Sequence, residues 1–140
     1  MASRTIKLTN IKPGTYMSWF ATTQACFKNT MTLKDDKKTY FKATRQSTNI
    51  EPPMAQGSAR YVGKDLTLII DIPQAKEEDL KVFLNTFTLL TPAGDEAGYS
   101  FTVCGEDYID NDFNDFYLTV MAWNSEGGGK NVAESGEVPS

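Results

Sequence analysis

Residues 106–115, with the sequence Glu-Asp-Tyr-Ile-Asp-Asn-Asp-Phe-Asn-Asp and named the acidic loop here, are the most chemically distinctive segment of the chain. The segment contains five carboxylates and two side-chain amides but no basic residue. Like charges at this density between two apolar segments repel one another unless a positive charge neutralises them. Ca2+ takes about six to eight oxygen ligands and suits such a set best. The sequence therefore predicts a calcium site in the acidic loop.

An EF-hand is one interpretation of the acidic loop, because it would explain the spacing of Asp110, Asp112 and Asn114. The rest of that motif fails, since Asp115 stands where Gly is required and Met121 stands where Glu is required. A solvated loop that binds no ion is a second interpretation. It accounts less well for so dense a cluster between two hydrophobic segments.

A calcium loop on an extended backbone is the third interpretation, and it is the one we favour. Asp110, Asp112 and Asn114 are spaced by two, so their side chains point the same way along a strand-like path. Glu106 and Asp115 can reach the same centre from either end of the loop. Such a cluster could hold one Ca2+ ion or two neighbouring ions.

The segments that must position the acidic loop have the character of short strands. They are rich in β-branched and aromatic residues and are separated by turn residues. Nine strands are expected, at residues 5–9, 15–21, 25–33, 39–43, 59–62, 66–72, 80–90, 99–104 and 116–123. Residues 44–58 are expected to form a surface loop, and residues 73–79 one helical turn with Pro73 at its first position. The pattern predicts an all-β fold, an antiparallel β-sandwich of about nine strands.

Large aromatic side chains in these strands could stack on a bound ligand. Trp19, Phe20, Phe83 and Trp123 are the candidates. Because side chains alternate between the two faces of a strand, we expect most of the four to be core residues. Tyr108 and Phe113 differ in lying inside the acidic loop, where an exposed Tyr108 could stack on the apolar face of a ligand or contact a partner, and Phe113 could plug the site from beneath.

Composition limits the classes of protein that the chain can belong to. Its 140 residues suit one domain, expected at residues 1–123, followed by a flexible tail at residues 124–140 with three consecutive glycines. Outside the acidic loop, 13 acidic residues face 14 basic ones without a basic stripe, so no nucleic-acid partner is expected. No apolar segment is long enough for a signal peptide or a membrane span. We expect synthesis in the cytoplasm, with possible release by a route that needs no signal peptide.

Catalytic chemistry finds little support in the sequence. The chain has no histidine, which excludes the usual zinc sites and His-based catalytic triads. Cys26 and Cys104 form no metal-binding motif and are expected to be buried free thiols rather than a disulfide. The protein is therefore expected not to be an enzyme.

The segment from Gly105 to Asp115, followed by Trp123, resembles the signature of the bacterial calcium-mediated lectins that bind fucose and mannose. That family's pattern is Glu-Asp-x-x-Asp-Asn-Asp-Tyr-Asn-Asp and then a strand that ends in Trp. The resemblance implies a nine-stranded β-sandwich in which two vicinal sugar hydroxyls coordinate two adjacent Ca2+ ions. Two departures leave the number of ions at one or two. Thr22 stands where the family has an Asn ligand, and a tail follows Trp123 where the family's chain ends.

The resemblance also implies roles for individual residues. The implied calcium ligands are Glu106, Asp110, Asp112, Asn114 and Asp115. The implied sugar contacts are Asp107, Tyr108, Ile109, Thr22 and Thr23.

The function expected from the sequence is calcium-dependent carbohydrate binding by a homo-oligomer, with a glycan of the fucose or mannose type as partner. The alternative is a β-sandwich in which calcium is structural and the domain binds protein or membrane as a surface or toxin-like module. The two differ in whether the ion keeps an open, solvent-facing coordination position.

Overall fold

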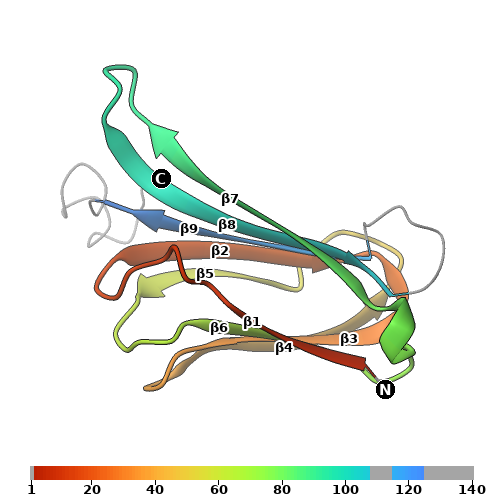
Figure 1. The fold of residues 1–140 in the computed structure, drawn as a ribbon. Helices are drawn as coiled ribbons and strands as arrows, with labels where there is room; N and C mark the ends of the chain where they lie inside the picture. Colours follow the sequence, from red (N-terminus) through yellow and green to blue (C-terminus); the bar gives the residue numbers. More distant parts are fainter. Residues whose placement is uncertain (1, 108–114, 125–140) are drawn as a thin grey trace.

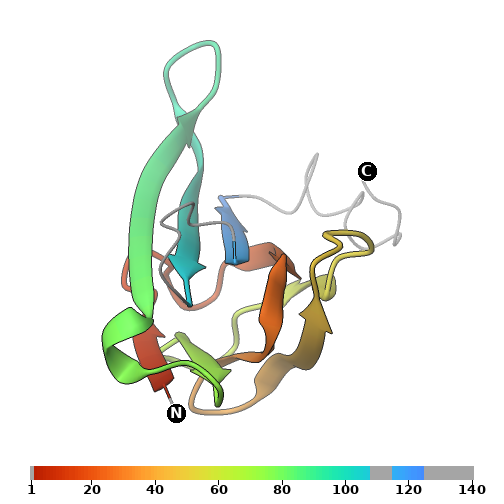
Figure 2. The same cartoon turned by 90° about the vertical axis from the view of Figure 1, so that its right-hand side faces the viewer.

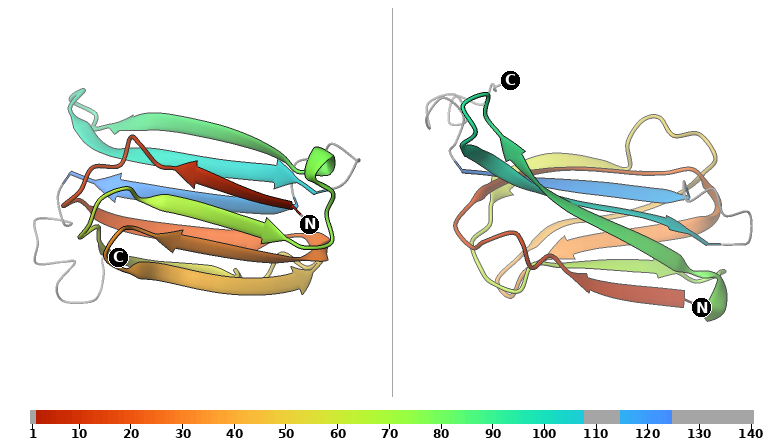
Figure 3. Two further views of the ribbon diagram at one scale, coloured as in Figure 1. Left: turned by 60° about the horizontal axis from the view of Figure 1, so that its bottom comes forward. Right: turned by 45° about the horizontal axis from the view of Figure 1, so that its top comes forward.

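The computed structural model describes residues 2–107 and 115–124, which form two antiparallel sheets packed face to face (Figure 1). The strands are β1 (Ala2–Lys7), β2 (Tyr16–Thr23), β3 (Ala25–Lys34), β4 (Thr39–Ser47), β5 (Ala55–Arg60), β6 (Thr67–Ile72), β7 (Lys81–Leu90), β8 (Glu96–Glu106) and β9 (Phe116–Trp123). One sheet has the order β1-β6-β3-β4 and the other β5-β2-β9-β8-β7 (Figure 3). The predicted β-sandwich of about nine strands is confirmed.

The core lies between the sheets and follows from the alternation of side chains along the central strands. In β6, Leu68, Ile70 and Ile72 are fully buried, while the residues between them are half-buried. In β9, Leu118 and Val120 fill the same layer from the other sheet. Burying one such aliphatic side chain stabilises the fold by about 1.5–3 kcal/mol, so these two strands hold the sheets together.

Several boundaries differ from the sequence prediction. β4 continues to Ser47 and β5 begins at Ala55, so the expected loop at residues 44–58 shrinks to residues 48–54. Both strands lie at sheet edges, where polar side chains are tolerated and the apolar alternation is weak. The expected helical turn is a short 3-10 helix, η1 (Glu77–Asp79), and it begins well after Pro73.

The expectations for aromatic and cysteine side chains are partly wrong. Trp19 is buried in the core, but Phe20 is 39% exposed and Phe83 is 57% exposed. Both cysteines are free, as expected, yet Cys26 is exposed and Cys104 is half-buried, so neither thiol is fully buried as predicted. Alternation predicts which residues share a strand face, but it does not predict whether another layer covers that face.

The acidic loop joins β8 to β9, two adjacent strands in the middle of the larger sheet. Phe116, the first residue of β9, pairs in register with Gly105 near the end of β8 and with Thr23 at the end of β2. The end of β8, the start of β9 and the end of β2 therefore lie at one edge of the molecule. The same edge is seen on the right in Figure 1. Within residues 2–107 and 115–124, no helix is long and apolar enough to cross a membrane.

Candidate functional site

Three carboxylates meet where the acidic loop leaves and re-enters the sheet. Glu106 is the last residue of β8, Asp107 follows it, and Asp115 directly precedes β9. Their exposed fractions are 0%, 4% and 7%. One carboxylate oxygen from each lies within 4.8 Å of the other two. Three ionised carboxylates at this separation, removed from water, repel one another strongly and attract a cation.

Backbone contacts fix the two ends of the acidic loop relative to each other. The Asp115 amide donates to the carbonyl oxygen of Gly105 at 3.0 Å. The Asp107 amide donates to a carboxylate oxygen of Asp115 at 2.9 Å. The Asp115 side chain therefore faces the other end of the loop and stays beside Glu106 and Asp107.

Gly105 is required by the packing beneath the three carboxylates. A Cβ atom at this position would lie 1.9 Å from Cζ of the Phe116 ring. Phe116 is fully buried, so its ring has no free space into which to move. The ring lies directly against the Gly105 backbone, and this contact determines how closely the end of β8 approaches the start of β9.

Strand β2 supports the same edge from the other side. The Thr23 hydroxyl donates to the carbonyl oxygen of Asp115 at 2.6 Å, and the Gln24 amide donates to that oxygen at 3.0 Å. The hydroxyl of the adjacent Thr22 donates to the carbonyl oxygen of Ile50 at 2.8 Å. The two threonines thus connect the acidic loop with the loop at residues 48–54.

The three carboxylates fit a calcium ion in spacing and chemistry. Calcium–oxygen distances are about 2.3–2.6 Å, so ligands on opposite sides of one ion are about 5 Å apart. The separation of at most 4.8 Å found here lies within that limit. Because Ca2+ takes about six to eight oxygens, three carboxylates fill only part of its coordination shell. Further ligands must come from the acidic loop itself or from water.

Of the five predicted calcium ligands, the structure describes two and brings them together, namely Glu106 and Asp115. Asp110, Asp112 and Asn114 lie outside the described residues. The prediction that these three bind calcium is therefore neither supported nor opposed by the structure.

The predicted sugar contacts fall into three groups. Tyr108 and Ile109 lie outside the described residues. Asp107 is buried with its carboxylate beside those of Glu106 and Asp115, a position from which it could bind metal as well as a sugar hydroxyl. Thr22 and Thr23 are buried, and both hydroxyls donate to backbone carbonyls. Their assignment as sugar contacts stays a prediction.

An open groove of about 680 Å3 lies beside the supporting strand β2. It is lined by Phe20 and by the loop residues Asn49, Ile50, Glu51, Pro52 and Pro53. The Thr22–Ile50 hydrogen bond joins this groove to the strand that supports the acidic loop. The sequence predicts a connecting loop at this place, and the adjacent Pro52 and Pro53 are the local feature that sets this loop apart.

Three solved bacterial lectins share this architecture. A high-affinity mannose-binding lectin of Ralstonia solanacearum superposes with a TM-score of 0.62 at 17% identity, over 84% of this chain and 93% of its own. The C-terminal domain of the lectin BC2L-C from Burkholderia cenocepacia gives a TM-score of 0.63 at 14% identity, over 85% of this chain and 96% of its own. This chain has the fold of bacterial lectins.

The third of these structures is the lectin CV2L of Chromobacterium violaceum in complex with alpha-methyl-fucoside. Its TM-score is 0.58 at 12% identity, over 84% of this chain and 93% of its own. No family model and no curated protein matches the sequence. The similarity is therefore one of fold, and it covers nearly the whole length of each lectin chain.

Proposed function

We propose that this chain is a calcium-dependent carbohydrate-binding protein and that the acidic loop forms its binding site. The observation that carries the proposal is the convergence of the buried carboxylates of Glu106, Asp107 and Asp115 within 4.8 Å. The convergence occurs at one edge of a β-sandwich whose fold is shared by lectins described as binding mannose and as holding a fucoside.

In this proposal the carboxylates of Glu106 and Asp115 hold calcium together with Asp110, Asp112 and Asn114. When bound, calcium would supply the positive charge that offsets repulsion within the loop, as well as coordination positions for a pair of sugar hydroxyls. Asp107 then has a second use, since a carboxylate is a strong acceptor for a sugar hydroxyl. The proposal keeps Tyr108 and Ile109 as the sugar contacts that the resemblance implies, with Thr22 and Thr23 on β2.

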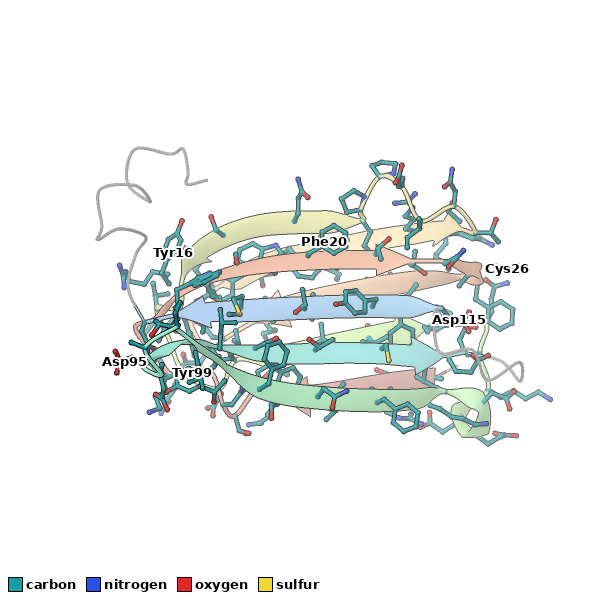
Figure 4. All side chains as sticks on the ribbon, turned by 90° about the horizontal axis from the view of Figure 1, so that it is seen from above. Tyr16, Phe20, Cys26, Asp95, Tyr99 and Asp115 are labelled. Atoms are coloured by element: carbon teal, nitrogen blue, oxygen red, sulfur yellow. The ribbon has the colours of Figure 1, made fainter. Side chains whose placement is uncertain are left out.

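The groove beside β2 suits the less polar face of a sugar. Phe20 projects from the outer face of the larger sheet and is 39% exposed, so its ring offers a platform for C–H groups (Figure 4). Asn49 and Glu51 line the same groove and provide an amide and a carboxylate for hydroxyl groups. A groove that combines an apolar floor with a few polar side chains is the usual form of a small-molecule site.

Glycans of the fucose and mannose type are the proposed ligands, and the proposed role is binding rather than catalysis. Single sugar sites bind weakly, so a homo-oligomer would gain avidity on a glycosylated surface. Synthesis in the cytoplasm, followed by release, remains part of the proposal.

The test is binding of fucosides and mannosides by titration calorimetry, with the protein first in calcium and then in excess EDTA. Binding in calcium that EDTA abolishes and added calcium restores is the expected result. Glu106→Gln should remove binding. Asp95→Asn, at the opposite end of the molecule from Asp115, should leave binding unchanged (Figure 4).

A different result would favour the second candidate, a module with structural calcium. In that case calcium would raise the melting temperature of the wild-type chain, while a broad glycan array would show no calcium-dependent binding. If calcium changed neither binding nor melting, both candidates would be wrong.

A further inference from the structure

The loop between β4 and β5 forms one wall of the groove beside β2, and neighbouring side chains fix its backbone. Nη2 of Arg45 in β4 donates to the carbonyl oxygens of Asn49 at 2.9 Å and Glu51 at 3.0 Å. The Thr22 hydroxyl in β2 donates to the carbonyl oxygen of Ile50, which lies between them in the chain, at 2.8 Å. Three consecutive carbonyls are therefore held by side chains from two strands, one in each sheet. A wall fixed in this way is ordered before a ligand arrives, which lowers the entropic cost of binding.

This loop starts at the same edge of the molecule as the three buried carboxylates. Ser47, the last residue of β4, pairs in register with Ala25. The residue before Ala25 is Gln24, whose amide donates to the Asp115 carbonyl. β4 and β8 both end at this edge (Figures 1 and 2). At its other end the loop enters β5, which pairs with β2, so the groove wall leads away from the carboxylates along the larger sheet.

Phe20, the floor of the groove, is too far from the carboxylates for one sugar to contact both. Phe20 pairs in register with Thr119, which is four residues beyond Asp115 in the chain. At a rise of about 3.3 Å per residue, this spacing corresponds to about 13 Å along the strand. A single sugar ring is shorter than that, so a sugar held by the carboxylates leaves the floor of the groove to the next sugar of a glycan. The groove volume of about 680 Å3 also exceeds the volume of one sugar ring.

The lining of the groove matches a sugar chain better than it matches a peptide. Phe20 is 39% exposed and Ile50 is 47% exposed, and with the two adjacent prolines they offer apolar contacts to the C–H faces of sugar rings. Asn49 and Glu51 add an amide and a carboxylate for hydroxyl groups. A peptide that binds as an added strand pairs with backbone groups, and the carbonyls of the wall already accept hydrogen bonds from side chains.

We propose that the acidic loop and the groove together bind an oligosaccharide, with its terminal sugar at the carboxylates and the next sugar in the groove. This inference rests on the proposed function and adds the length of the glycan to it. Phe20 contacts the second sugar. Arg45 is a positioning residue, because it holds the wall without lining the groove. The loop between β4 and β5 thereby selects among glycans that share the same terminal sugar.

The test is titration calorimetry in calcium, comparing the methyl glycosides of mannose and fucose with disaccharides that carry the same terminal sugars. The wild type should bind the matching disaccharide about three- to tenfold more tightly, the gain expected from one aromatic contact. Phe20→Ala should bring the ratio of the two affinities to about one. Tyr16→Ala is the matched control, because Tyr16 lies on the same strand at the end away from Asp115, and its ratio should equal that of the wild type (Figure 4).

A second pair of variants tests the positioning role of Arg45. Arg45→Ala should lower the ratio of disaccharide to methyl glycoside affinity, because two carbonyls of the wall lose their donor. Lys42→Ala removes an exposed cation from the same strand and should keep the wild-type ratio. A merely structural role of Arg45 would lower the melting temperature of Arg45→Ala without changing the ratio, and that result would remove Arg45 from the proposal.

The outcomes separate this inference from the proposed function. Equal affinity of the wild type for methyl glycosides and disaccharides would overturn the inference and leave calcium-dependent sugar binding intact. Failure to bind any of these sugars would overturn both. A preference for disaccharides that persists in Phe20→Ala would place the second sugar outside the groove. If Phe20→Ala lowered the mass in sedimentation equilibrium and kept the wild-type ratio, the groove would be a contact between copies of the chain instead.

Discussion

The Thr23 hydroxyl donates to the carbonyl oxygen of Asp115 at 2.6 Å, and the two residues are 92 positions apart in the chain. Thr23 is fully buried at the end of β2, and Asp115 is the residue from which the acidic loop enters β9. The bond therefore couples the conformation of one end of the candidate calcium site to the core of the larger sheet.

Thr23→Val should weaken calcium binding more than it weakens the fold. Val has nearly the same shape, but it removes the hydroxyl that donates to the Asp115 carbonyl beside the Gln24 amide. Loss of one buried hydrogen bond costs about 0.5–1.5 kcal/mol of stability. Calcium affinity, measured by titration calorimetry, should fall as well, because the Asp115 end of the site is less firmly held.

A second threonine separates these two effects. Thr15 donates its hydroxyl to the Lys12 carbonyl at 2.8 Å in an exposed turn before β2. Thr15→Val should alter stability slightly and leave calcium affinity unchanged. Equal calcium affinity in Thr23→Val and Thr15→Val would show that the Thr23 bond has no part in the site.

Gly105→Ala should be among the most destabilising single changes near the site. The added methyl group would lie 1.9 Å from the Phe116 ring, which is fully buried. Overpacking of a filled core costs about 1–3 kcal/mol, and here the backbone at the end of β8 must also shift. Urea denaturation of the variant should show a lower free energy of unfolding with a similar dependence on urea.

The double variant Gly105→Ala/Phe116→Leu identifies the cause of that loss. Leu is smaller than Phe, so it should make room for the methyl group, and the double variant should be more stable than the sum of the single effects predicts. A coupling energy of about 0.5–3 kcal/mol is typical of residues in contact. Simple additivity would mean that the ring does not set the requirement for Gly.

Calcium should raise the melting temperature of the wild-type chain, and Asp115→Asn should remove most of that increase. A ligand at about 100 times its dissociation constant stabilises the folded state by about 2.7 kcal/mol. For a domain of this size about 1 kcal/mol shifts the melting temperature by about 3 °C, so an increase of about 8 °C is expected. Without calcium, Asp115→Asn should melt at or above the wild-type temperature, because one of three crowded charges is gone.

Asp95→Asn is the control for this prediction. Asp95 lies in the turn between β7 and β8, at the opposite end of the molecule from Asp115 (Figure 4). Its calcium response should equal that of the wild type. A full response in Asp115→Asn would remove Asp115 from the ligand set.

Much of the fold follows from the sequence because short strands with regular turns leave few alternatives. Leu68, Ile70 and Ile72 alternate cleanly, and β6 is found where the sequence places it. The exposure of Phe83 does not follow, because it depends on how far the smaller sheet extends beneath β7. The packing of the two sheets determines how far the smaller sheet extends, and no pattern within the β7 sequence reveals that packing.

The sequence predicts the types of residue in the candidate site better than it predicts their arrangement in space. The dense carboxylates of the acidic loop predict that Glu106 and Asp115 approach each other, and their carboxylate oxygens do lie close together. Alternation along a strand would send Glu106 and Asp107 to opposite faces, yet both carboxylates converge because β8 ends at Glu106. The support from Thr23 depends on a contact across most of the chain, so no local pattern could reveal it.

A separate polar network in the turn between β3 and β4 sets a pH dependence of stability. Asp35 is 3% exposed and accepts hydrogen bonds from the Tyr40 hydroxyl and from the amides of Lys37, Lys38 and Gly63. Burial opposes ionisation of Asp35, but these bonds outweigh it and hold the pKa of Asp35 below its usual value. Burial, and then the bond to Asp35, raises the pKa of Tyr40 to about 12.

Tyr40→Phe should therefore lower stability near neutral pH and flatten its pH profile at both extremes. The contribution of Asp35 is present above its unfolded pKa of about 3.9 and is lost as the pH falls through the lower folded value. The contribution of Tyr40 is present below about pH 10 and is lost as the pH rises through about 12. Because a hydrogen bond to a charged group contributes about 1.5–3 kcal/mol, the deficit of Tyr40→Phe should approach that size at pH 7. Urea denaturation from pH 2 to about pH 12 measures both curves, and parallel curves for wild type and variant would show that the Asp35–Tyr40 bond does not control this dependence.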